Sequence, residues 1–158
     1  KIRSDIILAS TSSFNLDRSV VIFGKAKSLN KFVNKPNGID LISSYKRASN
    51  ILESELKDKN LELSNTTDPG IFKTEFEKNL YKKINELSKY FQSINKDEDF
   101  EQSINNLAES KKVIFDFFDN VIVNDEDITI KKNRLELIQM LCKTFDYYVN
   151  FSLIDSLQ

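Results

Sequence analysis

The sequence predicts an all-α protein, a bundle of five or six helices. Apolar residues recur at steps of three and four along most of the 158 residues, and this spacing places them on one side of a helix. No segment alternates apolar and polar residues over a useful length, which argues against a sheet. With 40% hydrophobic and 30% charged residues, the composition also excludes collagen-like, low-complexity and wholly disordered chains.

The first predicted helices lie before residue 57. A short helix is expected around Ile6–Leu8, and helical spacing then runs from Val20 to Val33 and from Leu41 to Leu56. The segment Lys35-Pro36-Asn37-Gly38 separates the last two. A residue before proline is pushed out of the helical region, and glycine is free to adopt a positive φ. We therefore expect a turn between two helices there.

The clearest helix is predicted over residues 71–94. Asp68 supplies an N-cap acceptor before it and Pro69 suits the first turn, so residues 65–70 are expected to form a turn. The apolar stripe of this helix consists of Phe72, Phe76, Leu80, Ile84, Leu87, Phe91 and Ile94.

Two more long helices are expected toward the C-terminus. An apolar stripe runs from Phe100 to Val121, interrupted by Lys111, and the acidic residues 97–99 favour a helix N-terminus before it. The link to the preceding helix is short, so the two are expected to be antiparallel. The last helix follows an acidic turn at 124–127 and carries the stripe Leu135, Ile138, Leu141, Phe145 and Val149.

The composition excludes several kinds of chemical site. The chain has no histidine and a single cysteine, so Cys/His and Ser/His/Asp catalysis are excluded. Cys142 lies among apolar residues and is expected in the core. The three glycines are scattered and form no phosphate-binding loop, and helix capping explains the acidic clusters. We expect no catalytic residue, metal site or cofactor in this chain.

A single helical domain, excised from a longer chain, is expected over residues 1–158, because the sequence opens with Lys1 and its one methionine is Met140. Residues 1–17 are expected to be an N-terminal extension or short helix, and residues 18–158 the domain proper. No run approaches the roughly 18 apolar residues of a membrane span, and no signal sequence opens the chain. We expect a cytoplasmic protein with no membrane partner.

Basic residues are concentrated in residues 17–47, which suits a polyanionic partner, although a solvated helix face explains most charge clusters. Lys27 and Lys31 are four residues apart and share one side of a helix, as do Lys46 and Asn50, with Arg47 on a neighbouring strip. Two helices are thus expected to present one basic edge. Lysine and arginine bind phosphates, and arginine and asparagine can also read the edges of unstacked RNA bases.

A second basic segment opens the last predicted helix, where cations oppose the helix dipole. These residues are either compensated by the acidic turn at 125–127 or used for binding. If they are compensated, Arg134 pairs with Asp119 or with a turn carboxylate. By the same structural interpretation, Asn50 of the first basic group caps backbone groups and does not bind RNA. The segment consists of Lys131, Lys132, Asn133 and Arg134.

Aromatic residues offer a further way to hold a nucleic acid. Tyr147 and Tyr148 are candidates for stacking on bases. The competing interpretation places aromatic residues in the core of the bundle, and it applies to Phe115, Phe117, Phe118 and Tyr148.

Four short motifs follow one another along the chain in a recognisable order. They are Lys46-Arg47-Ala48-Ser49-Asn50-Ile51-Leu52, the segment Phe117-Phe118-Asp119-Asn120-Val121-Ile122-Val123, the segment Asn133-Arg134-Leu135 and the final Phe151-Ser152-Leu153. In this order and spacing they resemble the C-terminal domain of the β subunit of bacterial glycyl-tRNA synthetases. The resemblance covers about residues 18–158.

The resemblance implies an all-helical anticodon-binding domain, similar to that of arginyl-tRNA synthetases, which is noncatalytic by itself. In this family the α subunit binds glycine and ATP, with magnesium, and performs the chemistry, while the β subunit recognises tRNA within a heterotetramer. The implied partners are a glycine tRNA, the remaining β-subunit domains and the α subunit, and not DNA. The alternative is a noncatalytic helical scaffold that docks other synthetase domains or the α subunit.

Glycine tRNAs share two anticodon cytosines, since all glycine codons begin with two guanines. A protein that reads them needs groups that accept from the cytosine amino group or donate to its carbonyl. Arg47 with Asn50, or Asn133 with Arg134, can supply such groups. The predicted tRNA-binding residues are therefore Lys27, Lys31, Lys46, Arg47, Asn50, Lys131, Lys132, Asn133 and Arg134.

Overall fold

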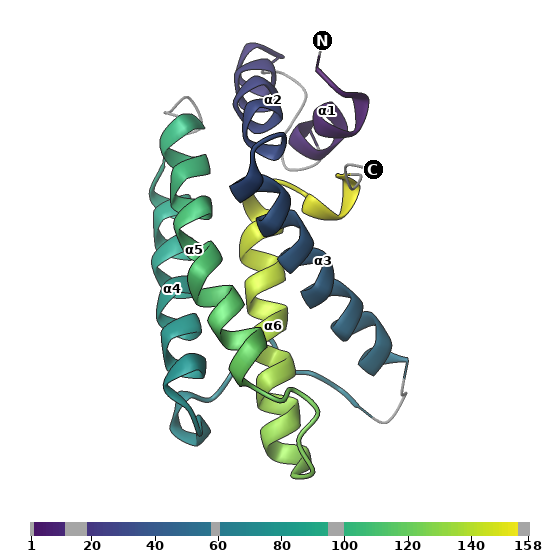
Figure 1. The fold of residues 1–158 in the computed structure, drawn as a ribbon, viewed down its shortest axis with the longest axis vertical. Coiled ribbons are helices and arrows are strands. Elements are labelled where there is room, and N and C mark those ends of the chain that lie inside the picture. Colours follow the sequence, from purple (N-terminus) through teal and green to yellow (C-terminus); the bar gives the residue numbers. More distant parts are fainter. Residues whose placement is uncertain (1, 12–18, 58–60, 95–99, 155–158) are drawn as a thin grey trace.

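The computed structural model describes residues 2–11, 19–57, 61–94 and 100–154 (Figure 1). Within these ranges the chain is helical and contains no strand, so the predicted all-α class is confirmed. The elements are α1 (Ser4–Thr11), α2 (Ser19–Val33), α3 (Pro36–Leu56), the 3-10 helix η1 (Pro69–Ile71), α4 (Glu75–Ser93), α5 (Phe100–Asn120), α6 (Ile128–Tyr148) and the 3-10 helix η2 (Phe151–Leu153).

Four long helices form the body of the molecule. α3 and α4 each pack against both α5 and α6, and α4 and α5 lie antiparallel, as predicted (Figure 1). α2 packs on α3 and α5 at one end of this body, and α1 packs on α2 and η2. Among the described helices, none combines the length and apolar composition that a membrane span requires.

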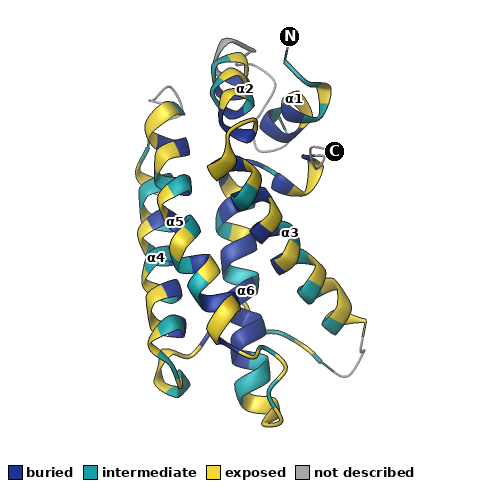
Figure 2. Cartoon of the chain, viewed as in Figure 1, coloured by how far each residue is buried: buried dark blue, intermediate teal, exposed yellow. Residues whose placement is uncertain are grey.

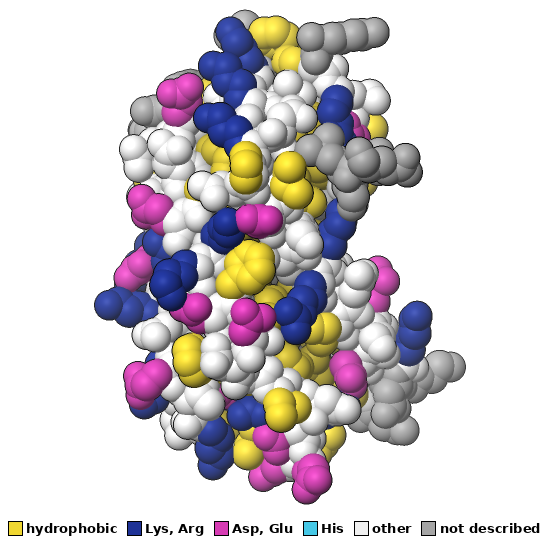
Figure 3. All heavy atoms as spheres, viewed as in Figure 1, with side chains coloured by type: hydrophobic (Ala, Val, Ile, Leu, Met, Phe, Trp, Pro, Cys, Tyr) yellow, Lys and Arg dark blue, Asp and Glu magenta, His cyan; other side chains and the backbone are white. Residues whose placement is uncertain are grey.

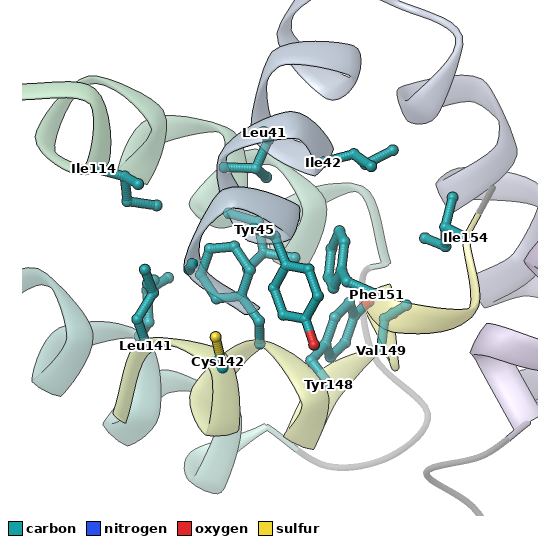
Figure 4. Packing of buried hydrophobic residues seen from close by; sticks show 14 of the residues in the cluster. Leu41, Ile42, Tyr45, Ile114, Leu141, Cys142, Tyr148, Val149, Phe151 and Ile154 are labelled. Atoms are coloured by element: carbon teal, nitrogen blue, oxygen red, sulfur yellow. The ribbon is translucent and has the colours of Figure 1, made fainter. Parts of the chain in front are cut away.

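The core lies along the inward sides of the four long helices, where buried residues line up in Figure 2. An aromatic cluster closes it near the end of α6. Between ring centroids, Tyr45 lies 6.2 Å from Phe145 and 5.6 Å from Phe151. Figure 4 shows Tyr45 and Phe151 side by side in this cluster. Cys142 is buried beside them, as its apolar neighbours in the sequence predicted.

The turn between α2 and α3 is confirmed, but glycine has a different role there. Lys35 is extended, with φ −96° and ψ 154°, and Pro36 occupies the first turn of α3, as expected. Gly38 lies inside α3, and no described glycine has a positive φ. A Cβ atom at Gly38 would lie 2.1 Å from the carbonyl oxygen of Phe32. The glycine therefore allows α2 and α3 to approach closely.

The start of α4 differs from the prediction. Asp68 caps η1 instead, because its side chain accepts a hydrogen bond from Gly70 N at 2.8 Å. The backbone is extended at Phe72 and the helix begins after Thr74. Thr74 and Glu77 form a capping box, in which each side chain accepts a hydrogen bond from the backbone N–H of the other residue.

The remaining predicted helix starts have separate outcomes. Asp127 caps α6 by accepting from Thr129 N at 2.8 Å, which confirms the acidic turn. The short helix predicted around Ile6–Leu8 is α1. The acidic residues 97–99, predicted to favour the N-terminus of α5, lie outside the described residues.

Candidate nucleic-acid interface

One side of α3 carries three of the predicted tRNA-binding residues together. Lys46 is half-buried and Arg47 and Asn50 are exposed. They line a shallow hollow, and we call its lining residues the α3 polar face. The α3 polar face consists of Ser43, Lys46, Arg47, Asn50, Ile51 and Ser54.

Arg47 is positioned by the end of α5 and still faces solvent. Its Nη2 donates a hydrogen bond to the carbonyl oxygen of Phe118 at 3.2 Å, and its guanidinium lies 4.8 Å from the centroid of the Phe118 ring. Its Nη1 lies 3.9 Å from Asp119 Oδ1, and the two side chains are 54% and 64% exposed. An ion pair this exposed is worth about 0–1 kcal/mol, so Arg47 can exchange this partner for an RNA group.

The lysines of α2 lie beside the other end of α5, near its first residues. Lys27 and Lys31 are both exposed, and Lys31 Nζ lies 3.9 Å from Glu101 Oε1. Since Arg47 lies beside Asp119, the rise along α5 between Glu101 and Asp119 separates the two basic groups by about 27 Å. α2 and α3 thus present two basic groups spaced along α5.

Another lysine of the basic segment is not on the surface. Lys25 is fully buried, its Nζ donates to the carbonyl oxygen of Tyr148, and it lies 4.4 Å from the centroid of that ring. Burial lowers the pKa of Lys25 to about 7. Lys25 therefore belongs to the packing of α2 on the end of α6.

Arg134 is buried, with 5% of the residue exposed, and the structure answers the question that the sequence left open. Its Nε donates to Glu77 Oε1 at 2.9 Å, and its Nη1 donates to Asp125 Oδ2 at 2.6 Å and to the carbonyl oxygen of Ile122 at 2.8 Å. Asp125 is the turn carboxylate that one interpretation anticipated, whereas Asp119 lies beside Arg47. Arg134 thus joins α4, α6 and the loop before α6.

Asn133 is also buried and holds the connection between α3 and α4. Its Oδ1 accepts from the hydroxyl of Thr67 and from Asp68 N, both at 2.7 Å, and its Nδ2 donates to the carbonyl oxygen of Asp68 at 3.0 Å. Glu136, one turn farther along α6, accepts from Ser64 N at 2.8 Å. We call the set the buried polar cluster. The buried polar cluster consists of Thr67, Glu77, Asn133, Arg134 and Glu136.

Glu77 is the acidic centre of this cluster. Burial alone would raise its pKa, but hydrogen bonds from Arg134 and Thr74 outweigh burial and lower the pKa below its usual value. Its second oxygen, Oε2, accepts from Thr74 N at 2.7 Å and from the Thr74 hydroxyl at 2.9 Å. The carboxylate is therefore satisfied on both oxygens, as a buried charge requires.

The lysines at the start of α6 lie outside this cluster. Lys131 Nζ lies 2.6 Å from Glu55 Oε2, and this partly buried ion pair connects α6 with the end of α3. Lys132 is half-buried. The four residues that follow one another in sequence thus point in different directions, because successive residues of a helix are about 100° apart.

Two residues of α5 near the α3 polar face were not predicted as candidates. Lys111 Nζ lies 2.5 Å from Asp40 Oδ2 of α3, and Phe115 is 36% exposed. The interruption of the apolar stripe at Lys111 was the available signal, since it marks a position that turns away from the core. Phe117, Phe118 and Tyr148 are buried, as the core interpretation held, while Phe115 and Tyr147 are exposed.

The described residues contain no group of three or more Cys, Asp or Glu side chains placed to hold a metal ion. Cations, amides and aromatic rings, such as those on α3 and α5, are groups that can bind phosphates and bases.

The fold is all-helical within the described residues, and comparison with known families assigns the chain to a family of anticodon-binding domains. A model of the DALR anticodon binding domain matches residues 41–151, so the chain belongs to that family. The matched range includes both the α3 polar face and the buried polar cluster.

Individual relatives of the chain narrow the similarity to one kind of protein. The chain is 35% identical over 127 residues to the glycine–tRNA ligase β subunit of Rickettsia prowazekii (strain Madrid E), and 38% identical over 128 residues to that of Rickettsia bellii (strain OSU 85-389). This confirms the resemblance predicted from the four motifs. The alignments cover 80% and 81% of this chain but 18% of each relative, so the chain corresponds to a small part of those proteins.

Proposed function

We propose that this chain binds the anticodon arm of a glycine tRNA, as a noncatalytic domain of a glycine–tRNA ligase β subunit. One observation carries the proposal: Lys46, Arg47 and Asn50 line an exposed hollow within the range that matches an anticodon-binding family. The identity to β subunits of glycine–tRNA ligases supports the choice of tRNA.

The geometry divides the predicted tRNA-binding residues into two groups. Lys27, Lys31, Lys46, Arg47 and Asn50 stay in the binding set, and Lys132 stays a predicted phosphate contact. Two of the others are buried and the third is held by Glu55, which supports a role in folding; these are Asn133, Arg134 and Lys131.

Recognition follows from the chemistry of the α3 polar face. Cytosine presents an amino donor and a carbonyl acceptor. The amide oxygen of Asn50 can accept from the first, and the guanidinium of Arg47 can donate to the second. Lys31 lies about 27 Å from Arg47 along α5, and Lys27 lies one turn away from Lys31 on α2, so these lysines can meet phosphates of the stem while α3 meets the loop.

In the whole enzyme this domain positions the tRNA. On this proposal, glycine and ATP with its magnesium bind to the α subunit, which performs activation and transfer. The remaining β-subunit domains link it to the domain described here, in an assembly of both subunit types in the cytoplasm. The role of this chain is then to orient the tRNA, so that the acceptor end of the tRNA reaches the distant catalytic site.

Salt-titrated binding of the chain to three transcripts tests the proposal. They are a glycine tRNA, the same tRNA with both anticodon cytosines replaced, and an unrelated tRNA. We expect the replacements to weaken binding about tenfold or more, since a lost bidentate contact costs about 1–3 kcal/mol. Arg47→Gln should abolish this preference, whereas Lys78→Gln, at an exposed ion pair on α4, should preserve it.

Equal binding to the three transcripts would move anticodon reading out of this chain. Binding that ignores salt and substitutions of Lys27, Lys31 and Arg47 would favour the alternative function, a helical scaffold that docks other synthetase domains or the α subunit.

A further inference from the structure

We infer that Phe115 of α5 is a stacking platform for one unpaired base of the bound RNA, beside the α3 polar face. The inference rests on the proposed function, which it deepens by naming the side chain that holds a base by its flat face.

The register of α3 and α5 places Phe115 beside the α3 polar face, whose lining residues all belong to α3. Lys111 contacts Asp40, and Arg47 contacts Phe118, so the residue numbers differ by 71 in both pairs. The two helices therefore run side by side in the same direction, as Figure 1 also shows. This register sets Phe115 level with Ser43 and Ser44, and Ser43 lines the hollow.

Charged residues of α5 lie one turn before and one turn after Phe115. Lys111 lies one turn before Phe115, paired with Asp40 at 2.5 Å, and its Nζ lies 5.8 Å from the centroid of the ring. Asp119 lies one turn after it, beside Arg47. Figure 3 shows apolar surface in the middle of this face, bordered by basic and acidic side chains. These contacts join α5 to α3 and so fix the position of the helix segment that carries Phe115.

Phe115 also departs from its neighbours in exposure. It is 36% exposed, while Phe117 and Phe118 of the same helix are buried in the core. An exposed aromatic ring next to cations is the combination that holds single-stranded nucleic acid, because the ring stacks on a base and the cations neutralise its phosphates. Phenylalanine has no hydrogen-bonding group, so it adds affinity, while Arg47 and Asn50 supply the choice of base.

Tyr147 is the competing platform and provides a matched control. It is an aromatic residue with 60% exposure, but it lies on α6, whereas the contacts of Lys111 with Asp40 and of Arg47 with Phe118 join α5 to α3 on either side of Phe115. If stacking depends on exposure alone, Tyr147 is the better candidate. If it depends on the cations and the hollow, Phe115 is.

The test uses an anticodon-arm hairpin of glycine tRNA that carries the fluorescent base 2-aminopurine at one loop position at a time. Stacking on an aromatic ring quenches this base. We expect quenching at one position with the unsubstituted chain, and its loss with Phe115→Leu together with about tenfold weaker binding. Phe115→Tyr, which keeps the ring, and Tyr147→Leu should each retain the quenching and the affinity. The salt dependence should be the same in all variants, since Phe115 touches no phosphate.

The outcomes separate this inference from the proposed function. Tight, cytosine-dependent binding with no quenched position, or with quenching that only Tyr147→Leu removes, would overturn the inference and leave the proposed function in place. If Phe115→Leu fails to fold, the absence of a quenched position with the unsubstituted chain, or loss of quenching with Tyr147→Leu, still overturns the inference. Absence of tRNA binding by the unsubstituted chain would overturn both.

Discussion

Arg47 with Asn50 on α3 and Arg134 with Asn133 on α6 are the same side-chain types in opposite surroundings. Arg134 is buried between two carboxylates at 2.9 and 2.6 Å, while the pair of Arg47 with Asp119 spans 3.9 Å and is more than half exposed. α6 packs against α3 and α4, so its inward cations need internal partners. The outward side of α3 borders a hollow. Surroundings, not residue type, decide which pair faces solvent.

The largest expected effect comes from the same substitution at the two arginines. Arg134→Met leaves Glu77, which is 1% exposed, as a buried charge without its cation, and should lower the free energy of unfolding by about 3–5 kcal/mol. Arg47→Met should lower it by less than about 1 kcal/mol. Urea unfolding at pH 7, followed by circular dichroism, measures both. Equal losses at the two sites would contradict the comparison.

Substitutions of Asn133 and Asn50 test the same comparison, with smaller expected losses of stability. Asn133→Ala leaves Asp68 N without its acceptor, while the Thr67 hydroxyl keeps only the backbone carbonyl oxygen of residue 133, and the change should cost about 1–3 kcal/mol of stability. Asn50→Ala, at an exposed position, should stay within about 0.5 kcal/mol. Because Asn133 holds the connection between α3 and α4, limited proteolysis within residues 61–74 should also become faster for Asn133→Ala alone. Unchanged cleavage would mean that other contacts hold this segment.

The sequence predicted the helices because the apolar residues that recur every three or four positions are the ones that the core buries. Some helix ends were harder to predict, because two neighbouring residues could each cap the helix. Asp68 and Thr74 are both good caps, and the prediction chose the first. The extended backbone at Phe72 separates η1 from α4 and gives the cap of α4 to Thr74.

The candidate site was predictable only where its residues share one helix. The spacing of Lys46, Arg47 and Asn50 placed them together without any tertiary information. The partner of Arg134 is Glu77, 57 residues away, which only the packing of α4 on α6 brings close. The exposure of Phe115 likewise depends on how α3 crosses α5, and its sequence neighbours favoured the core.

An acid titration tests the buried pair of Glu77 and Arg134. The pKa of Glu77 in the folded chain lies below its ordinary value of 4.5, so its carboxylate stabilises the fold above about pH 4.5. This stabilisation is lost as the pH falls through the folded-state pKa. Stability measured from pH 7 downward should therefore fall less steeply below pH 4.5 in Glu77→Gln than in the unsubstituted chain. Equal slopes in Glu77→Gln and the unsubstituted chain would contradict the assignment to Glu77.

The smallest expected effect concerns two lysines, one in the middle of α3 and one beside the end of that helix. Lys46 lines the hollow, and Lys131 is paired with Glu55 at 2.6 Å. Each phosphate contact contributes about 0.7–0.9 to the slope of log affinity against log salt, so Lys46→Gln should reduce this slope for tRNA binding by about that amount. It should do so equally for the glycine tRNA and its cytosine-replaced form, because phosphates carry no sequence information. Lys131→Gln should leave the slope unchanged, since this lysine already neutralises a carboxylate. A slope that falls with Lys131→Gln and not with Lys46→Gln would place the RNA backbone at the start of α6, and would reverse the division between binding and folding residues.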